Sequence, residues 1–133
     1  MTAISDLDTL LQSMSPELVE GNYVFCTVSG GLEQYLHLAP IATFREKEGL
    51  TLVLEEIAAR DANLAFDAVF RLITLTVHSS LEAVGLTAAF ATKLASYGIS
   101  ANVIAGYYHD HIFVQQDKAK AAMAALGEFS LGG

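Results

Sequence analysis

The stretch "ITLTVHSSLEAVGLTAAFATKLASYGISANVIAGYYHDHIFVQ", residues 73–115, decides the fold of this 133-residue chain. It begins within an apolar, β-branched run that predicts a strand over residues 71–79. Ser79 and Glu82 then have the Ser-x-x-Glu spacing of a capping box, which predicts the start of a helix. Apolar residues follow on one helical stripe as far as Gly98, a residue that commonly ends helices: Leu86, Phe90, Leu94 and Tyr97.

The segment after this helix predicts two strands joined by a tight turn. "ISANVIAGYY" and "HIFVQ" are rich in strand-forming residues, and the turn is expected at His109-Asp110. Tyr107 and Tyr108 would then point to opposite faces of the first strand, so one of them is expected in the core.

The order of elements from residue 70 onward is therefore strand–helix–strand–strand–helix. Asp117 is expected to cap the last helix, which Gly127 closes. With one more strand this order gives a ferredoxin-like α/β sandwich, in the α+β class. The short C-terminal "FSLGG" does not supply that strand, so the two halves of the chain either exchange a strand or share one sheet.

The N-terminal half predicts the complementary elements. Residues 5–14 predict a helix and "NYVFCTVS" predicts a strand that ends at two glycines. For the segment after Pro40, one interpretation is a long helix from near Glu48. The other is a hairpin, "ATFRE" and "LTLVL" around Lys47-Glu48-Gly49, followed by a short helix from Glu55. The hairpin is favoured because Gly49 suits a turn and "LTLVL" is rich in strand formers.

The composition limits the possible functions. Hydrophobic residues make up 53% of the chain, enough for a core, and the net charge of −8 argues against binding to nucleic acid or to anionic membranes. Residues 1–66 hold ten acidic and three basic residues, and residues 67–133 hold five and four. Cys26 lies in an apolar run and is expected to be buried and structural. No signal peptide or spanning segment is recognised, so a cytoplasmic protein is expected.

A candidate site follows from the topology of the second half. The strand ending at His78 and the strand ending near Tyr108 are joined by a crossover helix, so they run parallel and end at the same sheet edge. The helix that begins there offers free N–H groups to an anion. The polar residues expected to converge at this edge are His78, Ser79, Ser80, Glu82, His109, Asp110 and His111.

Three kinds of chemistry fit these residues, and none is decided by their spacing. His78, His109 and His111 could form a three-histidine zinc site, but no cysteine or further carboxylate pair supports it, so no metal is expected. Ser79 or Ser80 could act as a nucleophile with a histidine base, although no nucleophile elbow surrounds them. The third interpretation is a polar turn beside a capped helix.

Residues 73–115 with the helix after them resemble an ACT domain, a βαββαβ module that commonly binds amino acids in regulatory proteins. The segment "APIATFREKEGLTLVLEEIA", residues 39–58, looks like the hairpin of small bacterial proteins with two such units. The whole chain, over about residues 5–127, resembles a free-standing tandem ACT protein with halves at 1–66 and 67–133. Gly85 matches the loop glycine of many ACT domains, whereas Val84 stands where they have proline.

The resemblance implies a regulatory protein without catalytic activity or cofactor that binds an amino acid and forms a homodimer. Backbone N–H groups near Val84, Gly85 and Leu86 would hold the carboxylate, and Glu82 or Asp110 would meet the ammonium group. Gly85→Val is expected to weaken binding by blocking the approach of the backbone to the ligand, and to leave the fold largely intact. The alternatives are a metal-dependent or hydrolytic enzyme using the three histidines, and a purely structural adaptor.

Overall fold

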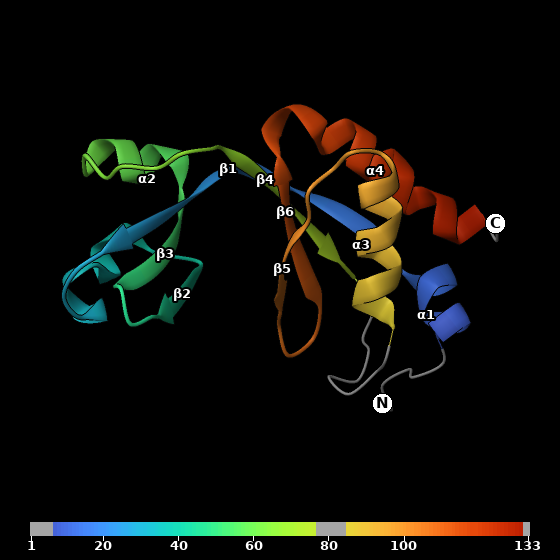
Figure 1. Cartoon of the computed structure of the whole chain (residues 1–133), viewed down its shortest axis with the longest axis horizontal. Coiled ribbons are helices and arrows are strands. Elements are labelled where there is room, and N and C mark those ends of the chain that lie inside the picture. The colour runs from blue at the N-terminus through green and yellow to red at the C-terminus, as the bar shows by residue number, and fades with distance from the viewer. Residues whose placement is uncertain (1–6, 77–84, 132–133) are drawn as a thin grey trace. The chain divides into compact units, whose positions relative to one another are not determined.

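The chain folds into two compact units, which we describe from a computed structural model covering residues 7–76 and 85–131 (Figure 1). Unit 1 comprises residues 1–20 and 71–133, and unit 2 comprises residues 21–70. Residues 7–20 therefore pack with elements from the second half of the chain. The boundaries of these compact units differ from those of the predicted tandem halves, 1–66 and 67–133. The halves describe a repeat along the sequence, and they stay a prediction.

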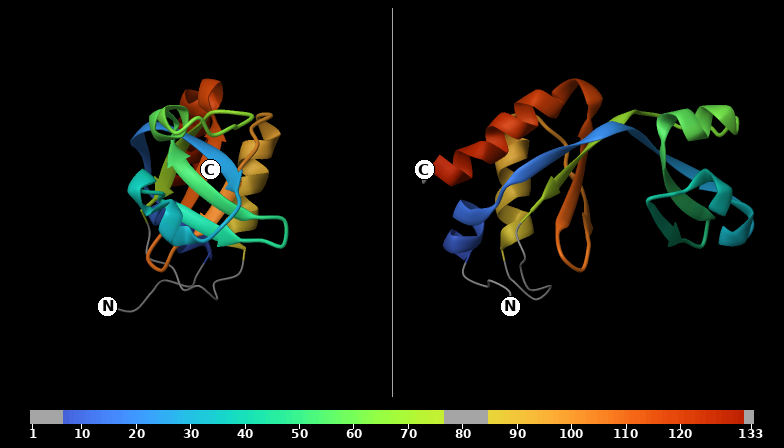
Figure 2. Two further views of the ribbon diagram at one scale, coloured as in Figure 1. Left: turned by 90° about the vertical axis from the view of Figure 1, so that its left-hand side faces the viewer. Right: turned by 180° about the vertical axis from the view of Figure 1, so that it is seen from behind.

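Unit 1 is an α/β sandwich in which helices cover one face of a sheet (Figures 1 and 2). Its strands lie in the order β1-β4-β6-β5, and β5 and β6 form an antiparallel hairpin. Its elements are α1 (Leu7–Ser13), the first part of β1 (Pro16–Val28), β4 (Phe70–Leu75), α3 (Leu86–Ser96), β5 (Asn102–Ala105), β6 (Asp110–Gln115), η3 (Gln116–Lys118), α4 (Ala119–Gly127) and η4 (Glu128–Leu131).

The fourth strand of unit 1 comes from the N-terminal end of the chain. The first part of β1 lies beside β4, where the Thr76 N–H donates to the Ser15 carbonyl at 2.9 Å and Arg71 Nη2 donates to the Val19 carbonyl at 3.2 Å. The predicted ferredoxin-like α+β sandwich is confirmed, and its missing strand is supplied by a segment far away in sequence.

The core of unit 1 explains why its apolar stripes fold in this way. Leu86, Phe90 and Leu94 repeat along α3 and are fully or nearly fully buried against the sheet. Ile73 and Leu75 alternate along β4 and point to the same side, because successive strand residues face opposite ways. The small buried residues of α4, including Ala122 at 0% exposure, let that helix approach closely.

Unit 2 contains an antiparallel sheet in the order β2-β3-β1 with a short helix, α2 (Glu56–Asp61). The predicted hairpin is confirmed as β2 (Ala42–Arg45) and β3 (Leu50–Glu55), with Glu46 and Gly49 exchanging backbone hydrogen bonds across the turn. Between β1 and β2 lie two short 3-10 helices, η1 (Leu32–Gln34) and η2 (Leu36–Leu38). Cys26 is buried in the core of this unit, and burial raises the pKa of its thiol, in agreement with a structural role.

One predicted position along α3 is wrong, and another falls on residues outside the described ones. The described helix α3 begins at Leu86, after Gly85, which takes a left-handed conformation with φ 95°. Ser79 and Glu82 themselves lie outside the described residues. Tyr97 leaves the buried stripe because the helix ends at Ser96, and its hydroxyl donates to Glu128 Oε2 at 2.5 Å.

Three details predicted around the last hairpin and helix are also wrong. The turn spans Gly106 to His109 and not His109-Asp110, because the Gly106 N–H donates to the His109 carbonyl at 2.9 Å and Asp110 already pairs with Ala105. Tyr107 and Tyr108 therefore sit in the turn, 73% and 63% exposed, and neither enters the core. Asp117 lies within η3, and the residue at the N-cap of α4 makes no side-chain capping bond.

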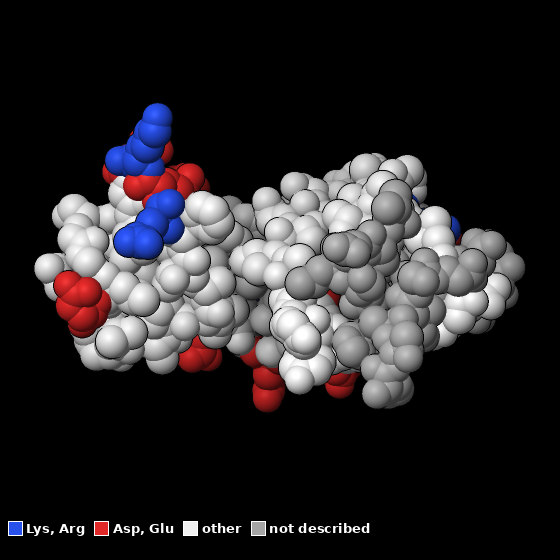
Figure 3. Space-filling view, turned by 90° about the horizontal axis from the view of Figure 1, so that it is seen from below, with Lys and Arg blue, Asp and Glu red and all other residues white. Residues whose placement is uncertain are grey.

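Charged groups are unevenly spread over unit 2. On unit 2 as seen in Figure 3, Lys and Arg side chains gather in one place with acidic side chains beside them, and other acidic side chains are scattered. Among the described helices, none is long and apolar enough to cross a membrane.

Candidate functional site

The predicted site at the sheet edge of unit 1 is only partly visible. His78, Ser79, Ser80, Glu82 and Val84 lie outside the described residues, so the three-histidine zinc set and the serine nucleophile stay untested. The other five residues are described: Gly85 and Leu86 at the start of α3, and His109, Asp110 and His111 at the turn and start of β6. In Figure 1 the first turn of α3 and the β5–β6 hairpin lie at the same end of unit 1, as the topology predicts.

The space beside Gly85 is occupied by the protein itself. A Cβ on Gly85 would stand 3.2 Å from Leu7 Cδ2, so the side chain of Leu7 from α1 packs against this glycine. Leu86 is buried in the core at 3% exposure. These two residues form a contact between α1 and α3, and ligand binding at their N–H groups stays a prediction.

His111 is held in the sheet by a neighbouring strand. Its Nδ1 lies 3.0 Å from Thr74 Oγ1 on β4, and a Cβ on Gly106 would come within 3.1 Å of its Nε2. Burial lowers the pKa of His111, the charge of His109 lowers it further, and Asp110 raises it. Burial raises the pKa of Asp110, against the opposing effects of His111 and His109. Within the described residues, no three His, Cys, Asp or Glu side chains are grouped as a metal site.

We expect His111 to make the protein less stable in mild acid. Its lowered pKa means that the unfolded chain takes up the proton first, so stability falls as the pH drops through about 6.5, the ordinary histidine value. The raised pKa of Asp110 acts in the opposite sense, at pH values nearer its ordinary 3.8. Urea unfolding of His111→Gln at pH 7.5, 6.5 and 5.5 should show a smaller acid-dependent loss than the unchanged protein. His37→Gln, at an exposed histidine of η2, should retain the full loss, and equal losses in all three proteins would contradict this role.

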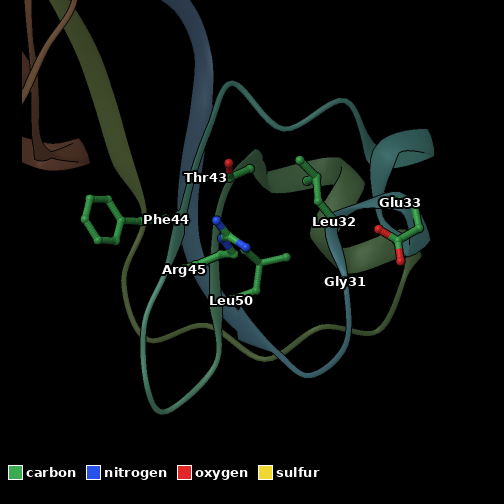
Figure 4. A pocket seen from close by; sticks show the side chains of 7 residues that line it. All are labelled: Gly31, Leu32, Glu33, Thr43, Phe44, Arg45 and Leu50. Carbon is green, nitrogen blue, oxygen red and sulfur yellow. The ribbon is translucent and has the colours of Figure 1, made fainter.

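A second candidate site lies entirely within unit 2. A cavity of about 640 Å³ opens between the loop after β1 and the β2–β3 hairpin (Figure 4). Its size falls within the roughly 300–1,000 Å³ typical of small-molecule sites. The residues that line it are Gly31, Leu32, Glu33, Thr43, Phe44, Arg45 and Leu50.

Strand pairing determines which side chains face this cavity. Across the β2–β3 hairpin, Thr43 pairs with Leu52 and Arg45 pairs with Leu50. Paired residues project to the same face of a sheet, and both leucines belong to the core of unit 2, so Thr43 and Arg45 lie on the core side. Figure 4 shows Arg45 and Leu50 next to one another, facing Leu32, while the ring of Phe44 points away. Leu50 is 5% exposed and belongs to the core of unit 2, so the cavity has an apolar floor.

Two charged side chains of opposite sign line the cavity. In the described part of the chain, no hydrogen bond or ion pair occupies the Arg45 guanidinium. Glu33 folds back over Gly31, because a Cβ on Gly31 would lie within 2.7 Å of a carboxylate oxygen of Glu33. A free guanidinium, a carboxylate and an apolar floor together suit a ligand that carries both charges and an apolar part.

This cavity is not predicted from the sequence. From the sequence, Gly30 and Gly31 are expected only to end a strand, and Arg45 is expected only as part of a hairpin. Two adjacent glycines followed by Glu33 were an available signal, since glycine permits a side chain to pack directly on the backbone. The pairing of Arg45 with Leu50 depends on the register of the hairpin, which cannot be derived from the sequence alone.

Comparison with protein families identifies the fold observed here. Two ACT domain models match the chain, one over residues 2–71 and the other over residues 68–128. The chain belongs to the ACT domain family. The predicted resemblance to a protein with two ACT-like units is thereby confirmed. A search of curated proteins gave no match.

Several solved structures are similar to this ACT protein. A Vibrio cholerae protein of unknown function, described as a possible transport protein, is 72% identical, with a TM-score of 0.88 over 93% of this chain and 95% of that one. An Agrobacterium tumefaciens protein is 14% identical, with a TM-score of 0.69 over 88% and 89% of the two chains. The ligand-free regulatory subunit of aspartate kinase from Thermus thermophilus is 10% identical, with a TM-score of 0.58 over 85% and 95%. The last two likenesses show a shared fold.

Proposed function

We propose that this ACT protein is a regulatory protein that binds a free amino acid and has no catalytic activity of its own. Its family and its fold, shared with regulatory subunits of aspartate kinase, support a role in small-molecule regulation. The observation that carries the proposal is the cavity of unit 2, where Arg45 and Glu33 stand beside the apolar Leu32 and Leu50.

The chemistry of the cavity matches the parts of an amino acid. The planar guanidinium of Arg45 can donate two parallel hydrogen bonds to a carboxylate. The carboxylate of Glu33 can accept hydrogen bonds from an α-ammonium group. Leu32 and Leu50 can cover an apolar side chain, which removes its surface from water. Binding of this kind requires no bond to be made or broken.

A second ligand site at the start of α3 in unit 1 stays part of this proposal. Asp110 would meet an ammonium group there, and the N–H groups near Gly85 would meet a carboxylate. The described residues favour the cavity of unit 2, because Leu7 packs against Gly85 and leaves less room beside it.

We also propose that the protein acts in the cytoplasm as a homodimer and regulates an enzyme on another chain. β2 lies at an end of the strand order, and a strand in that position exposes backbone groups that can pair with another chain. Ile41 and Phe44 are 47% and 71% exposed at or beside this strand, and an interface would bury them.

Calorimetric titration with the twenty amino acids tests the proposed function. At least one should bind with a dissociation constant of roughly micromolar to millimolar. Arg45→Gln should weaken that binding about 10- to 100-fold, because a charged hydrogen bond contributes roughly 1.5–3 kcal/mol. Light scattering on the same preparation should give the mass of two chains.

Arg60→Gln is the matched control, since it removes one positive charge from α2 of the same unit, where Arg60 pairs with Glu56. It should leave affinity unchanged. If no amino acid gives heat at millimolar concentration, the protein is better described as a structural adaptor. If Arg60→Gln weakens binding as much as Arg45→Gln, net charge and not the cavity accounts for the effect.

A further inference from the structure

We infer that the cavity of unit 2 selects amino acids with uncharged aliphatic side chains. In this inference Gly31 is a positioning residue, because its lack of a side chain lets the Glu33 carboxylate lie where it binds the α-ammonium group. This inference rests on the proposed function, because it takes the cavity as the amino-acid site. It adds the class of ligand and the means of selection.

The selectivity follows from the small number of charges that line the cavity. Arg45 and Glu33 are the two charged residues among its lining residues. If they hold the carboxylate and the ammonium group, no lining charge is left to pair with a charged ligand side chain. Removing such a charge from water without a partner is costly, so acidic and basic amino acids are disfavoured.

The apolar part of the cavity favours aliphatic side chains. Leu50 forms the floor as an almost fully buried member of the core of unit 2. Leu32 faces this floor from the loop and is 38% exposed, so a ligand packed between the two would remove apolar surface from water. An aliphatic side chain gains from both leucines, whereas a polar one loses hydration without a new partner.

The position of the Glu33 carboxylate depends on the absence of a side chain at Gly31. Its oxygens lie where a Cβ on Gly31 would crowd them, one of them at 2.7 Å. Gly31 has φ −92° and ψ 160°, an extended conformation that alanine adopts without strain. Alanine at this position therefore displaces the carboxylate while the backbone keeps its path. Gly31 acts through Glu33 and does not itself recognise the ligand.

Recognition of the ammonium group is separable from recognition of the carboxylate. The 2-oxo acid of leucine keeps the carboxylate and the side chain but lacks the ammonium group. It would leave Glu33 without a charged partner and place a carbonyl oxygen near a carboxylate. The ratio of leucine affinity to 2-oxo acid affinity therefore measures the contribution of Glu33 alone.

The test is a calorimetric titration of the full chain with L-leucine, L-glutamate, L-lysine and the 2-oxo acid of leucine. Leucine should bind at least tenfold more tightly than each of the other three. Gly31→Ala should bring the ratio of leucine to 2-oxo acid affinity close to one and should change the 2-oxo acid affinity less than threefold. Glu33→Gln should reduce the ratio in the same way, which guards against a folding defect in the glycine variant.

Gly127→Ala is the matched control, because a Cβ there would meet no atom of the described chain within 4 Å. It should keep the full ratio. If glutamate or lysine binds as tightly as leucine, or if Gly31→Ala and Glu33→Gln both keep the ratio, the inference is overturned and the proposed function stands. If none of the three amino acids binds but one of the twenty with a polar, charged or aromatic side chain does, the selectivity is wrong. If no amino acid binds at all, the proposed function itself fails.

Discussion

Leu52→Ala is expected to lower the free energy of unfolding by about 2–5 kcal/mol, the range for leucines deleted from well-packed cores. Leu52 lies on β3, the central strand of unit 2, and its side chain is 0% exposed. It pairs with Cys26 of β1 on one side and with Thr43 of β2 on the other. Strands on both sides hold the backbone in place, so the cavity left by alanine cannot collapse easily.

Leu36→Ala is the matched control in the same unit. Leu36 lies in η2 and is 60% exposed, so the same chemical change should alter stability by at most about 0.5 kcal/mol. Urea unfolding at neutral pH measures both variants, with fluorescence and circular dichroism followed together because the two units could unfold separately. Equal losses in the two variants would show that the packing of unit 2 is not as described.

The elements predicted correctly are those whose signals are local. The β2–β3 hairpin follows from strand-forming residues on both sides of Gly49, and the apolar stripe of α3 follows from Leu86, Phe90 and Leu94. At Gly49, however, the need for a turn is only part of the reason for a glycine. A Cβ on Gly49 would come within 3.0 Å of the Val28 carbonyl oxygen, so this residue also permits the hairpin to approach β1.

The features missed by the sequence analysis depend on contacts between distant segments. β1 is 13 residues long and begins at Pro16, whereas the sequence predicted a strand only from Asn22, because Glu17 and Glu20 interrupt the apolar run. Its first part becomes a strand by pairing with β4, which is far away in sequence. The cavity was missed for a related reason, since the faces of Arg45 and Thr43 depend on the β2–β3 register.

The glycine at the start of α3 has a different role from the one predicted for it. The capping box predicted at Ser79 and Glu82 lies outside the described residues, and α3 is described from Leu86, after Gly85. The glycine was assigned to ligand binding because it lacks a Cβ. In the structure its left-handed backbone and its contact with Leu7 give it a structural role. The prediction that Gly85→Val leaves the fold intact therefore needs correction.

Gly85→Val is expected to destabilise unit 1 substantially, whatever its effect on a ligand. Gly85 has φ 95°, and a β-branched residue at positive φ is strongly disfavoured, at a cost of roughly 1–3 kcal/mol. The new side chain would also displace Leu7, whose Cδ2 lies 3.2 Å from the position of a Cβ, at a further cost of order 1 kcal/mol. The melting temperature and the urea midpoint should both fall.

Two further variants separate the backbone strain from the contact with Leu7. Asparagine tolerates the left-handed region better than valine does, so Gly85→Asn should recover most of the stability lost to strain while keeping the crowding of Leu7. Adding Leu7→Ala to Gly85→Val relieves the crowding and leaves the strain, so this double variant should recover little. If Gly85→Val unfolds at the same urea concentration as the unchanged protein, Gly85 does not hold the conformation described, and the start of α3 is again open to the ligand role first predicted for it.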